Sequence, residues 1–119
     1  MFISFYEKID LVYNMQVFLL KELDDEKRTS LYNVSRALRY FVANRSYGYI
    51  DRLANAFSLA TLRHVLSEIM RDLRSAFDRG ESVYLPSDKD IENLLLLAEK
   101  DLSIVKIVVA YALAFPERR

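Results

Sequence analysis

The chain has 119 residues, of which 52% are hydrophobic and 13% aromatic, with two Gly, two Pro, no Cys and one His. So few Gly and Pro residues argue against an all-β fold, whose many turns need them, and the length fits one domain over residues 1–119. Without Cys there is no disulfide framework, Cys-based zinc site or thiol nucleophile, so we expect neither a metal nor a cofactor.

The formal net charge of zero, from 17 basic and 17 acidic side chains, hides a strong asymmetry. Residues 1–26 carry a net charge of −4, residues 27–63 carry +6, residues 64–80 are balanced and residues 81–119 carry −2. A local basic region attracts phosphate even when the whole chain is neutral. A neutral chain also repels its own copies only weakly, which suits an assembly.

Apolar periodicity predicts helices along nearly the whole chain. The first predicted helix covers residues 4–23, and the charged segment 24–28 is interpreted as a short polar connection. Thr29 or Ser30 is the predicted N-cap of a second helix that ends near Asn44. The apolar face predicted for this helix consists of Leu31, Val34, Leu38, Phe41 and Val42.

A short third helix is predicted over residues 49–56, after a break at Gly48. Ser58 then caps a long fourth helix that ends near Asp78, with Gly80 at its C-terminus. The apolar stripe predicted for the fourth helix consists of Leu59, Leu62, Val65, Leu66, Ile69, Leu73 and Phe77.

Two further helices follow. Ser87 is the predicted cap of a helix over residues 88–100, and Asp101 or Ser103 begins the last helix, which Pro116 ends. The expected fold is therefore all-α, a compact bundle of five to six helices. The last apolar run is shorter than the roughly 20 residues that cross a bilayer. No targeting segment is evident, so we expect a cytoplasmic protein with no membrane partner.

The second predicted helix carries Arg28, Tyr32, Arg36 and Arg39, spaced by four, four and three residues, which places them on one face. Guanidinium groups bind phosphate oxygens bidentately, and hydroxyl groups join such contacts. No acidic residue lies between positions 27 and 50 to neutralise this face. We therefore predict that it binds phosphate, the alternative being a solvated face.

The fourth predicted helix repeats this spacing with Arg63, Ser67, Arg71 and Arg74. Here a solvated face and a phosphate-binding face explain the pattern equally well.

Arg45 and Arg52 extend the basic region around Gly48, close to Tyr40, Tyr47 and Tyr49 in the sequence. Aromatic rings between arginines suit stacking on the bases of a single strand. Packing of these rings within the protein is the commoner outcome.

The remaining polar residues give no sign of a catalytic centre. His64 has no second His or Cys to share a metal, and the acidic clusters lie at a connection and in the first turn of a helix. There is no Gly-rich phosphate loop. We therefore expect no enzymatic activity.

Residues 50–66 also fit a helix-turn-helix pattern, with Ser58 as the cap of its second helix. That helix is long for a recognition helix. A second candidate surface is apolar, because Leu11, Met15 and Phe18 lie on the side of the first predicted helix that faces away from its core residues. Surplus apolar surface of this kind is typical of a protein interface.

Several short strings together resemble one known family. Residues 49–56, the long helix over 61–73, and residues 86–91 leading into 110–114 are similar to the small subunit of archaeal type I-A CRISPR interference (Cascade) complexes. The resemblance covers roughly residues 45–115 and includes no diagnostic catalytic motif. It implies an all-helical, non-enzymatic subunit whose copies pack head to tail and help to hold crRNA-paired target DNA and the displaced strand. The acidic N-terminal helix is the part of the chain that matches the family least.

The leading hypothesis is a small subunit of a CRISPR RNA-guided complex that binds DNA or RNA backbone without sequence specificity. Its expected partners are the other subunits of the complex and further copies of itself. A helix-turn-helix regulator and a protein-only helical adaptor remain as alternatives. The candidate nucleic-acid-binding residues, which come from the charge pattern because the family shares no invariant motif, are Arg28, Tyr32, Arg36, Arg39, Arg45, Arg52, Arg63 and Arg71.

Overall fold

The structure, a computed structural model, describes residues 23–114, and within this range it contains five helices and no strand. The predicted all-α globule is confirmed for this part of the chain. Apart from Leu23, the first predicted helix lies outside the described residues. The five helices are α2 (Asp25–Ala43), α3 (Gly48–Ala54), α4 (Leu59–Asp78), α5 (Asp88–Lys100) and α6 (Ile104–Ala114).

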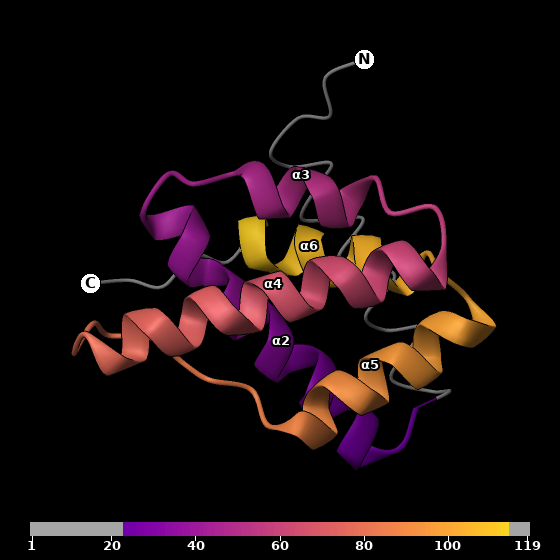
Figure 1. Cartoon of the computed structure of the whole chain (residues 1–119). Helices are drawn as coiled ribbons and strands as arrows, with labels where there is room; N and C mark the ends of the chain where they lie inside the picture. Colours follow the sequence, from indigo (N-terminus) through magenta and orange to yellow (C-terminus); the bar gives the residue numbers. More distant parts are fainter. Residues whose placement is uncertain (1–22, 115–119) are drawn as a thin grey trace.

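The five helices enclose one apolar core (Figure 1). Helix α2 packs against α5 and α6, α3 contacts α6 and α4, and α4 also packs against α5. The core contains Leu38 of α2 and Leu62 and Leu73 of α4, all 0% exposed. Helix α6 is apolar almost all round because it contacts α2, α3 and α5. Its composition therefore reflects a central position in the fold.

The buried faces of α2 and α4 agree with the predicted ones, except that Val42 of α2 and Leu59 of α4 are half-buried and that the end of α4 is exposed. Leu62 to Leu73 of the predicted stripe are buried, but Phe77 is 54% exposed. The last turn of α4 projects beyond the other helices (Figure 1), so no neighbour covers this ring. Periodicity correctly assigned the face of the helix and wrongly extended its buried length.

The start of α2 corrects the sequence prediction. Asp24 is the N-cap, and its carboxylate accepts a hydrogen bond of 2.8 Å from the backbone N–H of Lys27. Segment 24–28 is therefore the cap and first turn of the helix, where acidic side chains favour the helix dipole. Ser30 does not cap the helix; it is 1% exposed and faces α5.

The caps of α4 and α5 confirm the prediction. Ser58 accepts a hydrogen bond of 3.1 Å from the N–H of Thr61, and Ser87 accepts one of 3.1 Å from the N–H of Asp90. Asp90 in turn accepts from the N–H of Ser87, which completes a capping box. These short polar motifs act locally, so the sequence alone reveals them.

Helices α2 and α4 both end in a Schellman motif. In each helix, the residue after the left-handed position donates its N–H to a carbonyl oxygen of the last turn. The donor is Ser46 after α2, with an N···O distance of 2.8 Å, and Glu81 after α4, with an N···O distance of 3.1 Å. The left-handed residue is Gly80 after α4 (φ 83°) but Arg45 after α2 (φ 55°). Glycine adopts this conformation without strain, whereas a residue with a Cβ loses about 1 kcal/mol.

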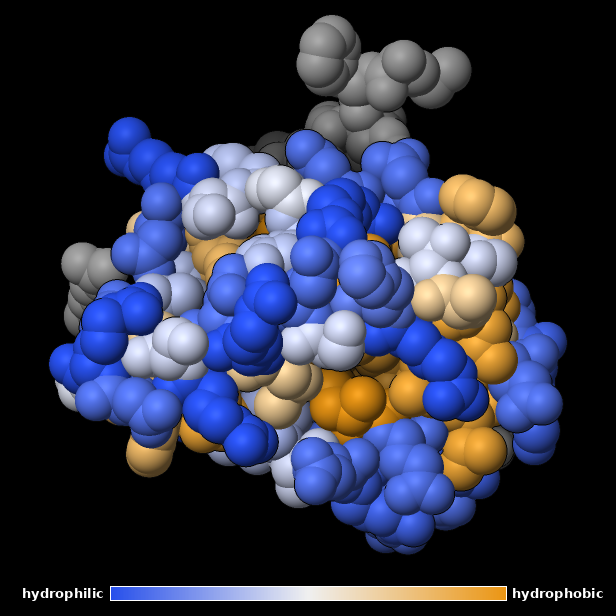
Figure 2. Space-filling model, in the orientation of Figure 1, coloured by the Kyte–Doolittle hydropathy of each residue, from blue (hydrophilic) through white to orange (hydrophobic). Residues whose placement is uncertain are grey.

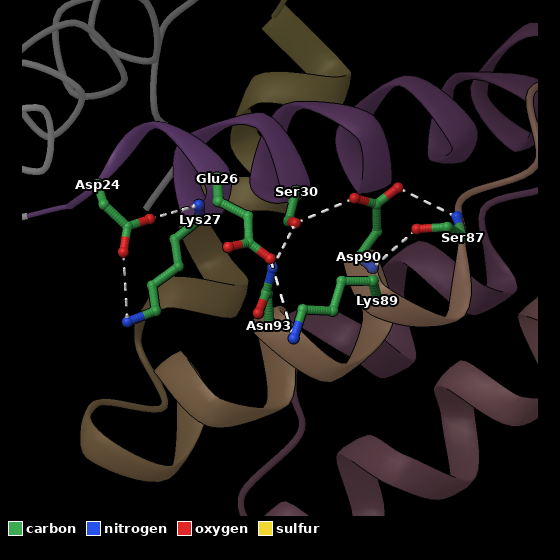
Figure 3. Close-up of polar contacts among 8 residues, drawn as sticks. All are labelled: Asp24, Glu26, Lys27, Ser30, Ser87, Lys89, Asp90 and Asn93. Carbon is green, nitrogen blue, oxygen red and sulfur yellow. Dashed lines mark hydrogen bonds and ion pairs between the residues drawn. The ribbon is translucent and has the colours of Figure 1, made fainter.

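A buried polar network joins α2 to α5 (Figure 3). Asp90, 7% exposed, accepts hydrogen bonds from Ser30 Oγ at 3.0 Å, from Asn33 Nδ2 at 3.1 Å and from the N–H of Ser87 at 3.1 Å. Asn93, 3% exposed, donates to Ser30 Oγ at 2.9 Å. Because these bonds require one register between the helices, the network fixes the rotation of α2 about its axis.

Glu26 closes the solvent edge of this network. It accepts a hydrogen bond from Asn93 Nδ2 at 3.3 Å, and its Oε1 lies 3.9 Å from Lys89 Nζ (Figure 3). Exposed ion pairs contribute little to stability. The buried bonds to Asp90 therefore carry most of the polar attachment between α2 and α5.

Candidate nucleic-acid interface

The α2 stripe, defined as Arg28, Tyr32, Arg36 and Arg39, lies on the side of α2 opposite its buried residues. Tyr32 and Arg36 are exposed, while Arg28 and Arg39 are half-buried. The α2–α5 network on the other flank holds the helix so that this side faces outward. The structure therefore brings these four predicted residues together on one surface.

The N-terminal end of the stripe is partly neutralised. Arg28 forms an ion pair and hydrogen bond with Asp25, one turn earlier, and Lys27 Nζ lies 3.7 Å from Asp24 Oδ2. These acids precede the acid-free region that the sequence pattern singled out. Because the helix begins at Asp25, they lie beside the first cations of the stripe and partly neutralise them.

Arg39 is the most unusual member of the stripe. Its guanidinium carbon lies 5.9 Å from the centroid of the Tyr32 ring and 5.7 Å from that of Tyr111 on α6. The two rings meet edge to face, with centroids 5.9 Å apart. Arg39 Nε is buried and has no hydrogen-bond acceptor, and no described acidic side chain pairs with this arginine. The arginine is thus held by aromatic rings, with its charge uncompensated.

A second stacked arginine lies beside the first. The guanidinium carbon of Arg36 is 4.6 Å from the centroid of the Tyr84 ring, which the loop between α4 and α5 supplies. Cation–π contacts of this kind orient the planar guanidinium. Sequence reasoning missed Tyr84 and Tyr111, because they come from a loop and from α6, far from α2 in the chain.

The C-terminal end of the stripe meets a small charged cluster. Tyr40 donates a hydrogen bond of 2.8 Å to Glu81, and Arg79 Nε donates one of 2.9 Å to the same carboxylate. These two bonds lower the pKa of Glu81, and the bond to the carboxylate raises the pKa of Tyr40. Glu81 thus places a negative charge next to the C-terminal end of the α2 stripe.

The tyrosines and arginines around α3 differ in whether they are exposed or bound to α4. Tyr47 is 45% exposed, whereas Tyr49 donates a hydrogen bond of 2.5 Å to Asp72 on α4, which raises the pKa of Tyr49. Arg52 forms an ion pair with Glu68 of α4 and stacks on Tyr49 at 5.7 Å. Arg52 therefore fastens α3 to α4.

Arg45 is exposed at the left-handed position after α2. No described side chain pairs with it, so its charge adds to the basic end of the helix.

Arg63 and Arg71 lie on a different side of the molecule from the α2 stripe. Both are exposed on α4. The faces of α2 and α4 that lie opposite their arginine stripes are buried in the same core, so the two stripes do not face each other. Figure 2 shows that the outward face of α4 is strongly hydrophilic. The structure therefore does not join the two predicted stripes into one site.

Three predicted interface residues, Leu11, Met15 and Phe18, lie outside the described residues. Within residues 23–114 no group of three or more His, Cys, Asp or Glu side chains could hold a metal ion. None of the helices in this range combines the length and hydropathy that spanning a bilayer requires. In comparisons with known proteins, no family model, curated protein or solved structure matched the chain.

Proposed function

We propose that the protein is a non-enzymatic small subunit of a CRISPR RNA-guided interference complex that binds nucleic-acid backbone without sequence specificity and packs against like subunits. The binding surface is the α2 stripe with Tyr84 and Tyr111 beside it. The family resemblance of residues 45–115 supports membership in the complex, and the side-chain geometry around α2 supports the contact with phosphate.

The single observation that carries the binding is the state of Arg39. A buried or half-buried cation normally has an acidic partner, because an uncompensated charge is costly in a desolvated setting. Arg39 instead lies beside the edge-to-face pair of Tyr32 and Tyr111 and has a buried Nε without an acceptor. A phosphate at this position would supply the missing negative charge and acceptor oxygens.

The surroundings of α2 favour backbone contact over base readout. A recognition helix must enter the major groove, which is about 12 Å wide. The α2 stripe is flanked by α6, through Tyr111, and by the loop that carries Tyr84. A helix bordered in this way meets phosphates at the surface of a nucleic acid but does not reach the base edges.

Equilibrium binding to several unrelated DNA sequences tests the proposal. Arg39→Ala should weaken binding roughly tenfold, by a similar factor for every sequence, as expected for a phosphate contact. Lys106→Ala is the matched control, because Lys106 is an exposed cation on α6 outside the stripe. Unchanged affinity of the Arg39→Ala variant would mean that the stripe is only a solvated face.

The same measurement separates the alternative functions. A preference of several kcal/mol for one duplex sequence would favour the helix-turn-helix regulator built on α3 and α4. No binding even at low salt would favour the protein-only adaptor. Purification from the native cell at low salt tests membership in the complex directly, because the proposal requires crRNA and the other effector subunits to co-purify.

A further inference from the structure

Helix α5 carries an acidic stripe, defined as Asp88, Glu92 and Glu99. Their spacing of four and seven residues places them on one side of the helix. All three are exposed, and none forms an ion pair with a basic side chain in residues 23–114. This side of α5 faces away from the buried network that holds the helix against α2.

Helix α4 carries the opposite charge on its own outward side. Arg63, Arg71 and Arg74 are exposed, and the described ion pairs engage only Arg71, whose Nε lies 3.7 Å from Asp72 Oδ1. Arg63 and Arg74 are eleven residues apart, as are Asp88 and Glu99. At 1.5 Å per residue the basic and acidic stripes are therefore both about 16 Å long.

A hydrophobic strip separates the two stripes. The helical spacing puts half-buried Met70 between the core and the arginines of α4, and half-buried Ile91 and Leu95 between the core and the acids of α5. Figure 2 shows hydrophobic surface between these helices, with hydrophilic surface on both sides. One face of the molecule thus runs from basic through apolar to acidic.

We propose that this face binds a second copy of the same chain in a closed, two-fold symmetric dimer, an arrangement that differs from the head-to-tail packing that the family resemblance implies. A two-fold axis along the hydrophobic strip places α4 of each copy on α5 of the other, as an isologous interface requires. Because α4 and α5 run in roughly opposite directions (Figure 1), Arg63 of one copy meets Glu99 of the other, and Arg74 meets Asp88.

Three properties make the second copy the occupant of this face. The two stripes match in charge, in number of side chains and in length. The chain has a formal net charge of zero, so two copies do not repel each other at long range. The two α4–α5 contacts of the dimer form together. They use the whole face of both copies, so the assembly stops at two copies. The inference uses none of the α2 residues that carry the proposed nucleic-acid contact.

Sedimentation of the full chain without nucleic acid tests this inference. At low salt the protein should sediment as a dimer of 14.0-kDa chains, and the dimer should dissociate as salt screens the ion pairs. Arg63→Glu/Arg74→Glu and Asp88→Arg/Glu99→Arg each place like charges opposite one another, at Arg63 with Glu99 and at Arg74 with Asp88. Each variant should therefore dimerise at least about tenfold more weakly than the wild type.

An equimolar mixture of the two double variants gives the decisive result, because both pairings become attractive again in the mixed dimer. Restored dimers support the interface and also show that both variants fold. Lys106→Glu, which changes the charge of an exposed α6 residue outside both stripes, should leave dimerisation unchanged. A monomeric wild-type chain, assembly beyond two copies, or no recovery in the mixture would overturn the inference, whatever the outcome of the nucleic-acid experiments.

Discussion

Replacement of Asp90 by alanine should be among the most destabilising polar substitutions in the described part of the chain. The change removes the acceptor of three hydrogen bonds, from Ser30 Oγ at 3.0 Å, Asn33 Nδ2 at 3.1 Å and the N–H of Ser87 at 3.1 Å. Ser30 is 1% exposed, so water cannot replace the lost acceptor at that position without opening the interface.

The magnitude follows from the burial of each donor. The bond from the buried Ser30 hydroxyl to a carboxylate contributes about 2 kcal/mol. The donors of half-buried Asn33 and exposed Ser87 can be rehydrated, so each contributes about 0.5 kcal/mol. The expected loss in the free energy of unfolding is therefore about 3 kcal/mol, or roughly 10 °C in Tm for a domain of this size.

Urea unfolding followed by far-UV circular dichroism measures this loss. Asp90→Asn should cost about half as much, because one oxygen remains while the new amide N–H₂ faces the donors of Asn33 and Ser87. Asp88→Ala is the matched control: it removes an exposed acid from the first turn of the same helix and should cost less than about 1 kcal/mol. A loss for Asp90→Ala no larger than that for Asp88→Ala would refute the assigned role of the network.

Three further predictions concern the helix ends, the loss of folding stability at acid pH, and the core. Arg45→Gly should stabilise the fold by about 0.5 kcal/mol, because relief of the left-handed strain exceeds the added entropy of the unfolded chain. Gly80→Ala should destabilise the fold by about 1 kcal/mol, because alanine is strained at the left-handed position. Changes of the same sign in the free energy of urea unfolding for the two variants would contradict this. The pKa of Glu81 is lowered in the folded state, so its contribution to stability is present above the ordinary value of 4.5 and is lost as the pH falls through the lower folded value. Glu81→Gln should therefore weaken the acid-side loss of stability, and parallel urea midpoints for variant and wild type across this pH range would count against the assignment. Leu73→Ala, at a position that is 0% exposed, should cost about 3 kcal/mol, against less than about 1 kcal/mol for Leu96→Ala at 46% exposure, as measured by thermal unfolding.

The sequence was informative wherever the controlling interaction is local. Ser58 and Ser87 were identified as caps because a hydroxyl before an apolar periodic segment bonds to an N–H three residues later. Gly80 was placed at a helix end for a similar reason. The start of α2 was missed because an acidic segment is equally typical of a linker and of a first helical turn. Only the burial of Ser30 against α5 decides between these interpretations.

The candidate site was harder to predict because its chemistry depends on distant segments. The spacing of the α2 stripe was sufficient to place four residues on one face. It could not reveal that Tyr84 and Tyr111 hold Arg36 and Arg39, because these rings come from other elements. Nor could it reveal that Arg52 is committed to Glu68, since that ion pair forms only once α3 packs on α4.

The salt dependence of DNA binding tests the central claim most directly, because each phosphate contact contributes a fixed increment to the slope of log K against log salt. Removing two contacts with Arg36→Ala/Arg39→Ala should reduce the magnitude of this slope for duplex DNA by about 1.8. Lys100→Ala/Lys106→Ala removes two exposed cations outside the α2 stripe and should leave the slope unchanged. Equal slopes for the wild type and the arginine variant would contradict the assignment of phosphate binding to α2.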